Sequence, residues 1–287
     1  MTEITQSMEH QMKLRISSSL FLLSLSIPAF ASYNQVEPVT ISPPAKFYIG
    51  IFGGGGSSNN INASQFAAAF LPAGSGGTLA VNAFGQMNSQ SSGFFGGQLG
   101  YQTQQIVLQP SSPWTLGPAV ELEGYSMNSS TFSGILVNSN VRAPEHDFQV
   151  SYPMNRTLFF ANGVLNFNNS NFPVHPYIGL GLGNALVRIS GANATQINPA
   201  EIGINHYNSN PSDTNSVFAG QVKLGLSYDF NKYVSAFVDY RWVYVASTHF
   251  LFGSTIYTGH AETTSWQVKL DAQRYNLGNI GLRLNLG

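Results

Sequence analysis

The sequence has 287 residues, with 12 Lys and Arg against 13 Asp and Glu, no Cys, 9% charged residues and 13% aromatic residues. A soluble domain carries about 25% charged residues, so this composition argues against a cytosolic globular protein. The apolar content of 43% with a net charge of −1 excludes an intrinsically disordered chain. The absence of Cys excludes thiolate metal sites, cysteine nucleophiles and disulfides. A pI near 6.6 offers no basic surface for nucleic acid, so we predict no nucleic-acid partner.

The first 31 residues have the pattern of a secretory signal peptide. Lys13 and Arg15 precede the apolar run Ile16–Ile27, and the small residues Ala29 and Ala31 follow it. This run is about 12 residues long, whereas a helix needs roughly 20 to span a bilayer. Basic residues, a short apolar run and a small-residue cleavage site together define a signal peptide, so we predict cleavage after Ala31. An uncleaved anchor or a buried helix is the alternative.

The remaining N-terminal boundaries follow from this assignment. Residues 1–11 are polar and acidic at two positions, so translation could also start at Met8 or Met12. We predict a signal peptide over residues 1–31, a periplasmic N-terminal segment over 32–45 and a single β domain over 46–287.

From residue 46 onward, apolar and polar residues alternate with a period of two, which is the period of a β-strand whose two faces meet different surroundings. Eight segments show this pattern. They are residues 47–52, 93–102, 116–123, 158–167, 178–186, 218–228, 234–244 and 279–286. No run of about 20 apolar residues is present after the signal peptide, so membrane-spanning helices are not expected.

The character of the two faces indicates a lipid environment. The polar face carries mostly Gly, Asn, Gln and Ser with isolated charges, which suits a narrow interior rather than a surface in water. The other face carries Leu, Val and Ile with aromatic residues towards the strand ends, as in the girdles of membrane barrels. A closed barrel is the β-structure that can span lipid with every backbone group bonded. A secreted β-sandwich is the alternative.

The connections between the eight segments alternate in length. Residues 53–92, 127–157, 190–216 and 247–274 form long connections, and residues 103–113, 168–176 and 229–232 form short ones. Bacterial outer-membrane barrels combine short periplasmic turns with long external loops in this way. We therefore predict an all-β, eight-stranded antiparallel up-and-down transmembrane β-barrel with four long external loops, which are functional or partly mobile.

Four motifs carry a resemblance to a known family. They are Lys46-Phe-Tyr-Ile-Gly-Ile, Pro176-Tyr-Ile-Gly-Leu-Gly-Leu-Gly, Gly225-Leu-Ser-Tyr-Asp-Phe and Ile280-Gly-Leu-Arg-Leu. The chain over residues 46–287 resembles the small eight-stranded outer-membrane barrels, namely the OmpA transmembrane domain, OmpX and the opacity-type surface proteins. Since these motifs are strand patterns, the resemblance implies a fold more firmly than an activity.

Charged residues on the polar face are the most specific signal for a site. Three carboxylates and three cations fall on that face: Glu121, Glu123, Lys223, Asp239, Arg241 and Arg283. The interior of an eight-stranded barrel is just wide enough to be filled by side chains, so these groups are expected to pair. We interpret them as a structural salt-bridge plug in the lumen. A narrow or gated ion path is the alternative.

The search for catalytic or metal-binding residues gives no motif. His146, His206, His249 and His260 fall in predicted loops without zinc-ligand spacing, so we predict ordinary solvated histidines. A lipid A deacylase-like site could be built from His249 with Ser254 and Glu262, but no motif surrounds them. We therefore predict no catalytic residues, no cofactor and no bound metal.

The predicted role follows from the predicted fold. We expect a monomer in the outer membrane of a Gram-negative cell envelope, in contact with membrane lipid and lipopolysaccharide. Its external loops are expected to contact host-surface or envelope proteins in an adhesin-like role. A lipid-modifying enzyme and a small ion pore are the alternatives.

Overall fold

The computed structural model describes residues 45–109, 112–139 and 146–286, all within the unit Thr40–Gly287. The predicted signal peptide and nearly all of the predicted periplasmic segment lie outside the described residues. Within the described residues, no helix is long and apolar enough to cross a membrane.

Fourteen strands and one short 3-10 helix make up the described part of the chain. They are β1 (Lys46–Ser58), β2 (Ile61–Ala69), η1 (Ala73–Ser75), β3 (Leu79–Met87), β4 (Ser91–Gln102), β5 (Ile106–Val107), β6 (Trp114–Asn138), β7 (Asp147–Asn169), β8 (Val174–Ser190), β9 (Asn193–Asn198), β10 (Ser212–Asp229), β11 (Val234–Val245), β12 (Thr248–Phe252), β13 (Trp266–Leu270) and β14 (Gln273–Leu286). All of their pairings are antiparallel, which confirms the predicted all-β antiparallel class.

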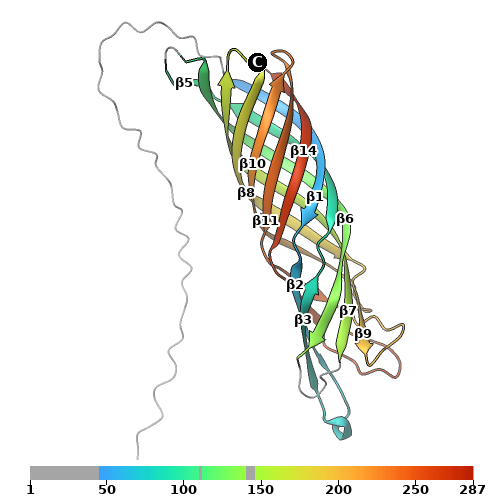
Figure 1. The fold of residues 1–287 in the computed structure, drawn as a ribbon. Helices are drawn as coiled ribbons and strands as arrows, with labels where there is room; N and C mark the ends of the chain where they lie inside the picture. Colours follow the sequence, from blue (N-terminus) through green and yellow to red (C-terminus); the bar gives the residue numbers. More distant parts are fainter. Residues whose placement is uncertain (1–44, 110–111, 140–145, 287) are drawn as a thin grey trace, which may run out of the picture. The chain divides into compact units, whose positions relative to one another are not determined.

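Eight of these strands pair in a closed ring. Its order is β1, β4, β6, β7, β8, β10, β11 and β14, and β14 pairs back onto β1 with Phe47 opposite Leu286. Each ring strand contains one of the eight predicted segments. Figure 1 shows the ring with the C-terminal end of β14 at one rim. A closed ring leaves no unpaired sheet edge over the paired length.

The outer surface of the ring is an apolar belt bounded by aromatic residues. The middle of the belt includes the exposed side chains of Ile51, Leu99, Leu122, Leu180, Leu182, Leu224, Val238 and Ile280. Exposed aromatic side chains towards its two ends include Phe47, Tyr101, Tyr228 and Tyr233 at the rim with the C-terminus, and Phe95, Phe159, Phe218 and Trp242 farther along the strands. This arrangement matches the apolar band and aromatic girdles of a barrel in lipid.

Glycine on the ring strands makes room for large side chains in the interior. A Cβ atom on Gly100 would lie 2.1 Å from the Tyr48 ring, and one on Gly225 would lie 2.4 Å from the Tyr177 ring. Both tyrosines are buried and lie over these glycines on neighbouring strands. The Gly-rich inner face therefore accommodates Tyr rather than leaving an open channel at these two points.

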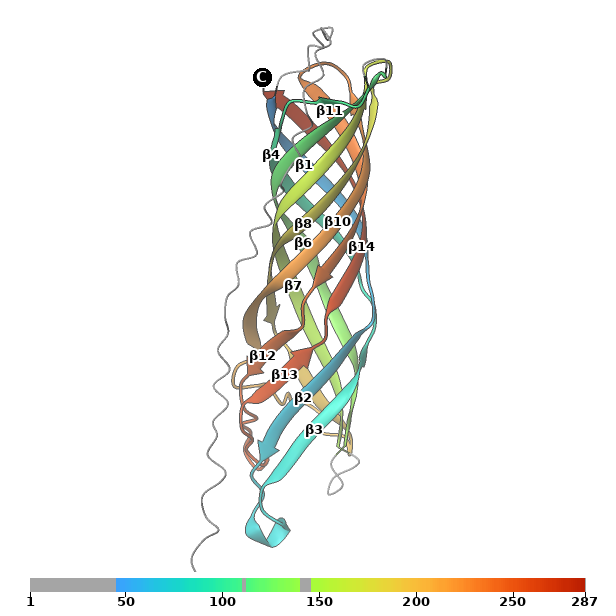
Figure 2. The same ribbon diagram turned by 90° about the vertical axis from the view of Figure 1, so that its left-hand side faces the viewer.

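The four long connections are not loops throughout, which corrects the sequence-based picture. β1 continues past Gly53–Gly56 to Ser58, and β6 and β7 have 25 and 23 residues. Since about 9–11 residues cross a bilayer, these two strands extend well past the apolar belt. Together with β2, β3, β9, β12 and β13 they continue the same antiparallel sheet beyond one rim of the ring (Figure 2). We call this part the extension.

Aromatic side chains pack together in the interior of the extension. Tyr207 packs 4.8 Å from Phe252 and 5.9 Å from Trp266, and Trp266 packs 5.6 Å from Phe148, measured between ring centroids. The Tyr207 hydroxyl donates to Gln65 Oε1 at 2.6 Å and lies 2.9 Å from the Tyr152 hydroxyl. These contacts join β2, β7, β12 and β13, so the extension is a packed structure.

Candidate functional site

The structure brings the six predicted lumen charges together into one network. All six side chains are buried inside the ring. Lys223 forms ion pairs with Glu121 and, at 2.9 Å, with Glu123. Arg241 Nη2 lies 3.3 Å from Glu123 Oε1, and Arg241 Nε lies 2.8 Å from Asp239 Oδ1. Arg283 Nη2 lies 3.3 Å from Glu121 Oε1, so every member has a partner of opposite charge.

Neutral side chains donate further hydrogen bonds to the carboxylates. The Tyr48 hydroxyl donates to Glu121 at 2.7 Å, and the Tyr177 hydroxyl donates to Asp239 at 2.7 Å. Gln221 donates to Glu123 at 2.6 Å. Buried charges are tolerated when they are paired and their remaining hydrogen-bonding positions are filled, and this network meets both conditions.

Aromatic rings cover the two guanidinium groups. The Arg241 guanidinium carbon lies 4.3 Å from the Phe52 ring centroid, and that of Arg283 lies 4.4 Å from the Phe237 ring centroid. Cation–π contacts within about 6 Å are attractive, and more so away from water. The arrangement is chemically suited to filling and stabilising a narrow interior.

Arg156 is a further buried cation that sequence reasoning missed. It lies on β7 and is 1% exposed. Its guanidinium donates to the hydroxyl of Tyr275 at 2.7 Å and to the hydroxyl of Ser130. The predicted fourth strand began at Leu158, two residues too late to include Arg156. The available signal is the alternation of apolar residues from Phe148 to Met154, whose face Arg156 continues before Leu158.

The residues considered for a deacylase-like triad do not assemble. His249 is exposed on β12, and Glu262 is exposed in the connection between β12 and β13. The Ser254 hydroxyl lies 3.3 Å from the Ser209 hydroxyl. Among the residues the structure describes, no hydrogen bond or ion pair joins His249, Ser254 and Glu262 side chains to one another, so this geometry does not support a nucleophile–base pair.

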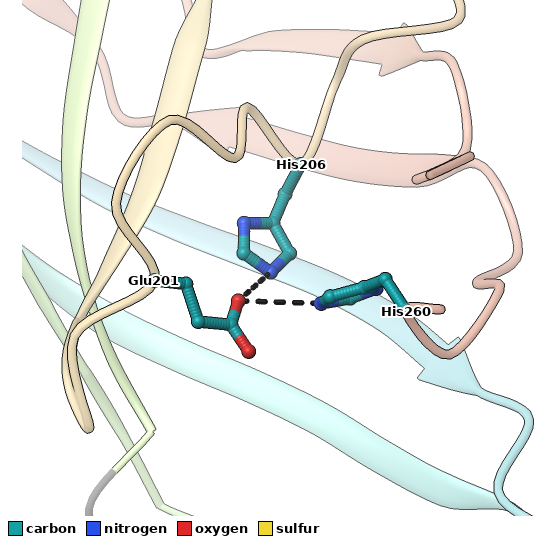
Figure 3. A group of neighbouring side chains, drawn as sticks. All are labelled: Glu201, His206 and His260. Atoms are coloured by element: carbon teal, nitrogen blue, oxygen red, sulfur yellow. Dashed lines mark hydrogen bonds and ion pairs between the residues drawn. The ribbon is translucent and has the colours of Figure 1, made fainter. Parts of the chain in front are cut away.

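A cluster of two histidines and one glutamate lies in the extension. Glu201 and His206 follow β9, and His260 lies between β12 and β13 (Figure 3). One carboxylate oxygen, Glu201 Oε2, lies 3.2 Å from His206 Nε2 and 3.2 Å from His260 Nε2. The prediction of solvated histidines is wrong for His206, which is 3% exposed, because the two loops pack against each other around it.

Burial governs the protonation of His206. Removal from water is the largest cause that lowers the pKa of its imidazole, and the nearby His260 and His146 rings lower it as well. The backbone carbonyl of Ala194 and the Glu201 carboxylate act in the opposite direction without reversing the shift. The neutral ring is therefore favoured more strongly than in an exposed histidine.

The ligand chemistry of this cluster differs from that of the lumen. One ligand atom from each of Glu201, His206 and His260 lies within 4.8 Å of the other two. Two imidazole nitrogens and one carboxylate oxygen form a ligand set that zinc and related divalent cations bind. Sequence spacing could not reveal it, because His260 lies 59 residues from Glu201 and the turn that carries His206 is irregular.

Comparison with known proteins gives one family match. A family model described as surface antigen matches residues 154–286, which covers most of β7 and all of β8 to β14. No curated protein matches the chain.

Three solved structures of outer-membrane proteins are similar to the chain. Neisserial surface protein A has 16% identity and a TM-score of 0.36, with 84% of this chain and 99% of that chain covered. The outer membrane protease OmpT of Escherichia coli has 9% identity and a TM-score of 0.25, covering 83% and 97%. The attachment invasion locus protein Ail of Yersinia pestis has 13% identity and a TM-score of 0.23, covering 77% and 98%.

The apolar belt and the surface-antigen match identify the class of protein. The chain is a bacterial outer-membrane surface protein built on antiparallel β-structure. This confirms the predicted localisation in the outer membrane. The closer resemblance to the OmpA transmembrane domain, OmpX and the opacity-type proteins stays a prediction.

Proposed function

We propose that the chain is an eight-stranded up-and-down transmembrane β-barrel that presents the extension outside the cell as an adhesin-like binding surface. The observation that carries this proposal is the extension itself, a part of the sheet beyond the lipid-facing belt with aromatic packing around Tyr207 and Trp266. A membrane anchor alone has no need of a packed structure of this size. Binding residues are commonly displayed on such surfaces by a rigid scaffold.

The outer face of the extension carries an exposed apolar row. Sheet register places Phe84 opposite Val137, and Gln267 between Leu251 and Phe66. We call the exposed side chains of Phe66, Phe84, Ile135, Val137 and Leu251 the outer apolar patch, each being between 44% and 55% exposed.

Polar and charged groups border this patch. Exposed Lys269 and His249 lie on the adjacent strands β13 and β12. Contiguous apolar side chains with a polar rim on a water-exposed surface mark protein-binding sites. The proposed partner is therefore a protein of the host surface, the matrix or the envelope, bound through apolar contacts with a charged rim.

The lumen supports a structural rather than a conducting role. The six charges pair with one another, and aromatic rings pack over the cations. We propose that the network is a plug, that the protein acts as a monomer and that its role is non-enzymatic. Membrane lipid and lipopolysaccharide are the proposed neighbours of the apolar belt.

The experiment compares attachment of bacteria that display variants of the outer apolar patch. Phe66→Ser with Leu251→Ser should reduce attachment to immobilised host cells and matrix proteins, because it removes two of the five exposed apolar side chains of the patch. Ser75→Ala, at the exposed last residue of η1, is the matched control and should leave attachment unchanged. Heat-modifiable migration on a denaturing gel verifies that each variant is folded in the membrane. Unchanged attachment by the folded double variant would contradict the adhesin-like role.

A further inference from the structure

The cluster formed by Glu201, His206 and His260 poses a problem of hydrogen-bond balance. Glu201 Oε2 lies 3.2 Å from the Nε2 atoms of both histidines. A carboxylate oxygen is an acceptor, and an imidazole nitrogen is either a donor or an acceptor according to the tautomer. The hydrogen bond made by Nδ1 of each ring therefore determines whether the Nε2 atom of that ring carries a proton.

Backbone carbonyls fix both tautomers. His206 Nδ1 lies 3.0 Å from the carbonyl oxygen of Ala194, and His260 Nδ1 lies 2.7 Å from the carbonyl oxygen of Ala261. A carbonyl oxygen can only accept, so each Nδ1 carries the proton. In a neutral ring the Nε2 atom then presents a lone pair. With both rings neutral, two lone pairs and a carboxylate oxygen face one another, which is repulsive unless a proton or a metal cation lies between them.

This orientation is the one that metal-binding histidines adopt. A ligating histidine donates its second ring N–H to a carbonyl or carboxylate, which fixes the ring and its tautomer. Here both rings have that support. The two Nε2–Oε2 separations of 3.2 Å also match the distance of about 3.3 Å between ligands at a tetrahedral zinc ion with bond lengths of about 2.0–2.1 Å.

The surroundings hold the ligands in place. The His206 ring packs edge-on against Phe148 at 5.1 Å and Trp266 at 5.6 Å. The Thr255 hydroxyl donates to the carbonyl of His206 at 2.8 Å and accepts from Trp266 Nε1 at 3.2 Å. These contacts connect the loop after β9 to the loop after β12, so the ligand from each loop is positioned before any cation binds.

A fourth group lies beside the cluster. His146 precedes β7, and its ring is near enough to influence the charge of His206. Its Nδ1 atom is buried and has no hydrogen-bond partner among the described residues. A buried polar atom without a partner requires an explanation, but His146 is not one of the three residues whose ligand atoms lie within 4.8 Å of one another, so it is not counted as a ligand.

We propose that Glu201, His206 and His260 bind a divalent transition-metal cation of the zinc class. The cation replaces the repulsion between the three ligand atoms by three coordinate bonds. Because the ligands come from two loops, bound metal fastens the loop after β9 to the loop after β12. The site lies in the extension and is independent of the proposed adhesin-like role, so the failure of one does not decide the other.

The test measures zinc binding to the full-length protein, purified from outer membranes without a histidine tag and stripped with EDTA. Titration calorimetry with ZnCl₂ should give one equivalent bound with micromolar or tighter affinity. His206→Gln and His260→Gln should each weaken zinc binding at least about tenfold, since each removes one of the two imidazole ligands. His249→Gln, on the same extension but exposed and outside the cluster, is the matched control.

A second readout keeps the proposal falsifiable if a variant is poorly folded. Heat-modifiable migration confirms the membrane fold of each variant, and X-ray absorption of the zinc-loaded unmodified protein should show two imidazole nitrogens with an oxygen donor. The proposal is overturned if the stripped protein binds no zinc at micromolar concentration. It is also overturned if His249→Gln weakens binding as much as the two cluster variants do.

Discussion

Arg241 and Glu123 form an ion pair across the full width of the ring. Their strands, β11 and β6, are separated by three strands in either direction around the ring, yet Arg241 Nη2 lies 3.3 Å from Glu123 Oε1. A pair between opposite walls occupies the lumen at that level with side chains. It also couples the two halves of the sheet through a contact that neighbouring-strand hydrogen bonds cannot provide.

Removal of Arg241 tests whether this network is a plug. Arg241→Ala leaves the Glu123 and Asp239 carboxylates with fewer cations, and breaking a buried pair costs about 3–5 kcal/mol. We expect a decrease of that size in the free energy of unfolding, measured with urea in liposomes. Asp239→Asn in the same chain should restore part of it, because the unbalanced charge is then removed.

The exposed Arg274 on β14 provides the matched control for Arg241. Arg274→Ala should leave stability nearly unchanged. If the lumen were a hydrated pore, water would screen the charges and Arg241→Ala would cost less than about 1 kcal/mol, as for exposed pairs. A small stability change together with altered ion selectivity in a planar bilayer would overturn the plug.

The positions of these charges could be predicted from the sequence because strand alternation is local. Lys223 and Arg241 lie on the polar face of their segments, and the register of β10 and β11 places them opposite each other. The period of two and the narrow interior of a small barrel are sufficient to place both inside. Which carboxylate each one contacts depends on the register of distant strands, and alternation within a segment carries no information about that register.

The extension was not predicted because the face of β7 that carries the apolar residues changes from the outer to the inner side along the strand. In the ring, Phe159 points outward to the apolar belt, while farther along the strand Val150 and Tyr152 point inward to an aromatic core. The inner face therefore changes from polar to apolar where the strand leaves the belt. The cluster at Glu201 and His206 was missed for a different reason, since packing between two irregular loops creates it.

A second prediction concerns the lipid-facing surface. Val238 is exposed in the middle of the apolar belt on β11, so Val238→Arg should lower the free energy of unfolding by about 2–4 kcal/mol if this surface meets the bilayer midplane. Single-tryptophan variants give an independent reading. Brominated lipids should quench the exposed Trp242 but not Trp266, which is fully buried in the extension. Equal quenching of the two would contradict the proposed membrane position.

Labelling with an impermeant maleimide tests the orientation. Cysteine at Ser75 or Thr258, both exposed at the extension, should react on intact cells, whereas Asn231→Cys, in the turn before β11, should not. Asn208→Cys should react more slowly, since this residue is only half-exposed. Asn138 lies in the predicted long connection 127–157, but it is 3% exposed, so Asn138→Cys should react poorly. Labelling of Asn231→Cys alone would show that the orientation is inverted.

The last prediction tests whether the extension is rigid. Tyr207→Phe removes the hydroxyl that donates to Gln65 at 2.6 Å and contacts the Tyr152 hydroxyl at 2.9 Å. A buried polar group left without its partner costs about 1–3 kcal/mol, so amide hydrogen exchange in β2 should accelerate while exchange in β11 stays unchanged. Tyr233→Phe, at an exposed position near the opposite rim, is the control and should alter neither strand. If Tyr207→Phe accelerated exchange in β2 and β11 equally, the extension and the ring would unfold as one unit. If exchange in β2 did not change at all, the hydrogen bonds of Tyr207 would not be what holds β2 against the aromatic core.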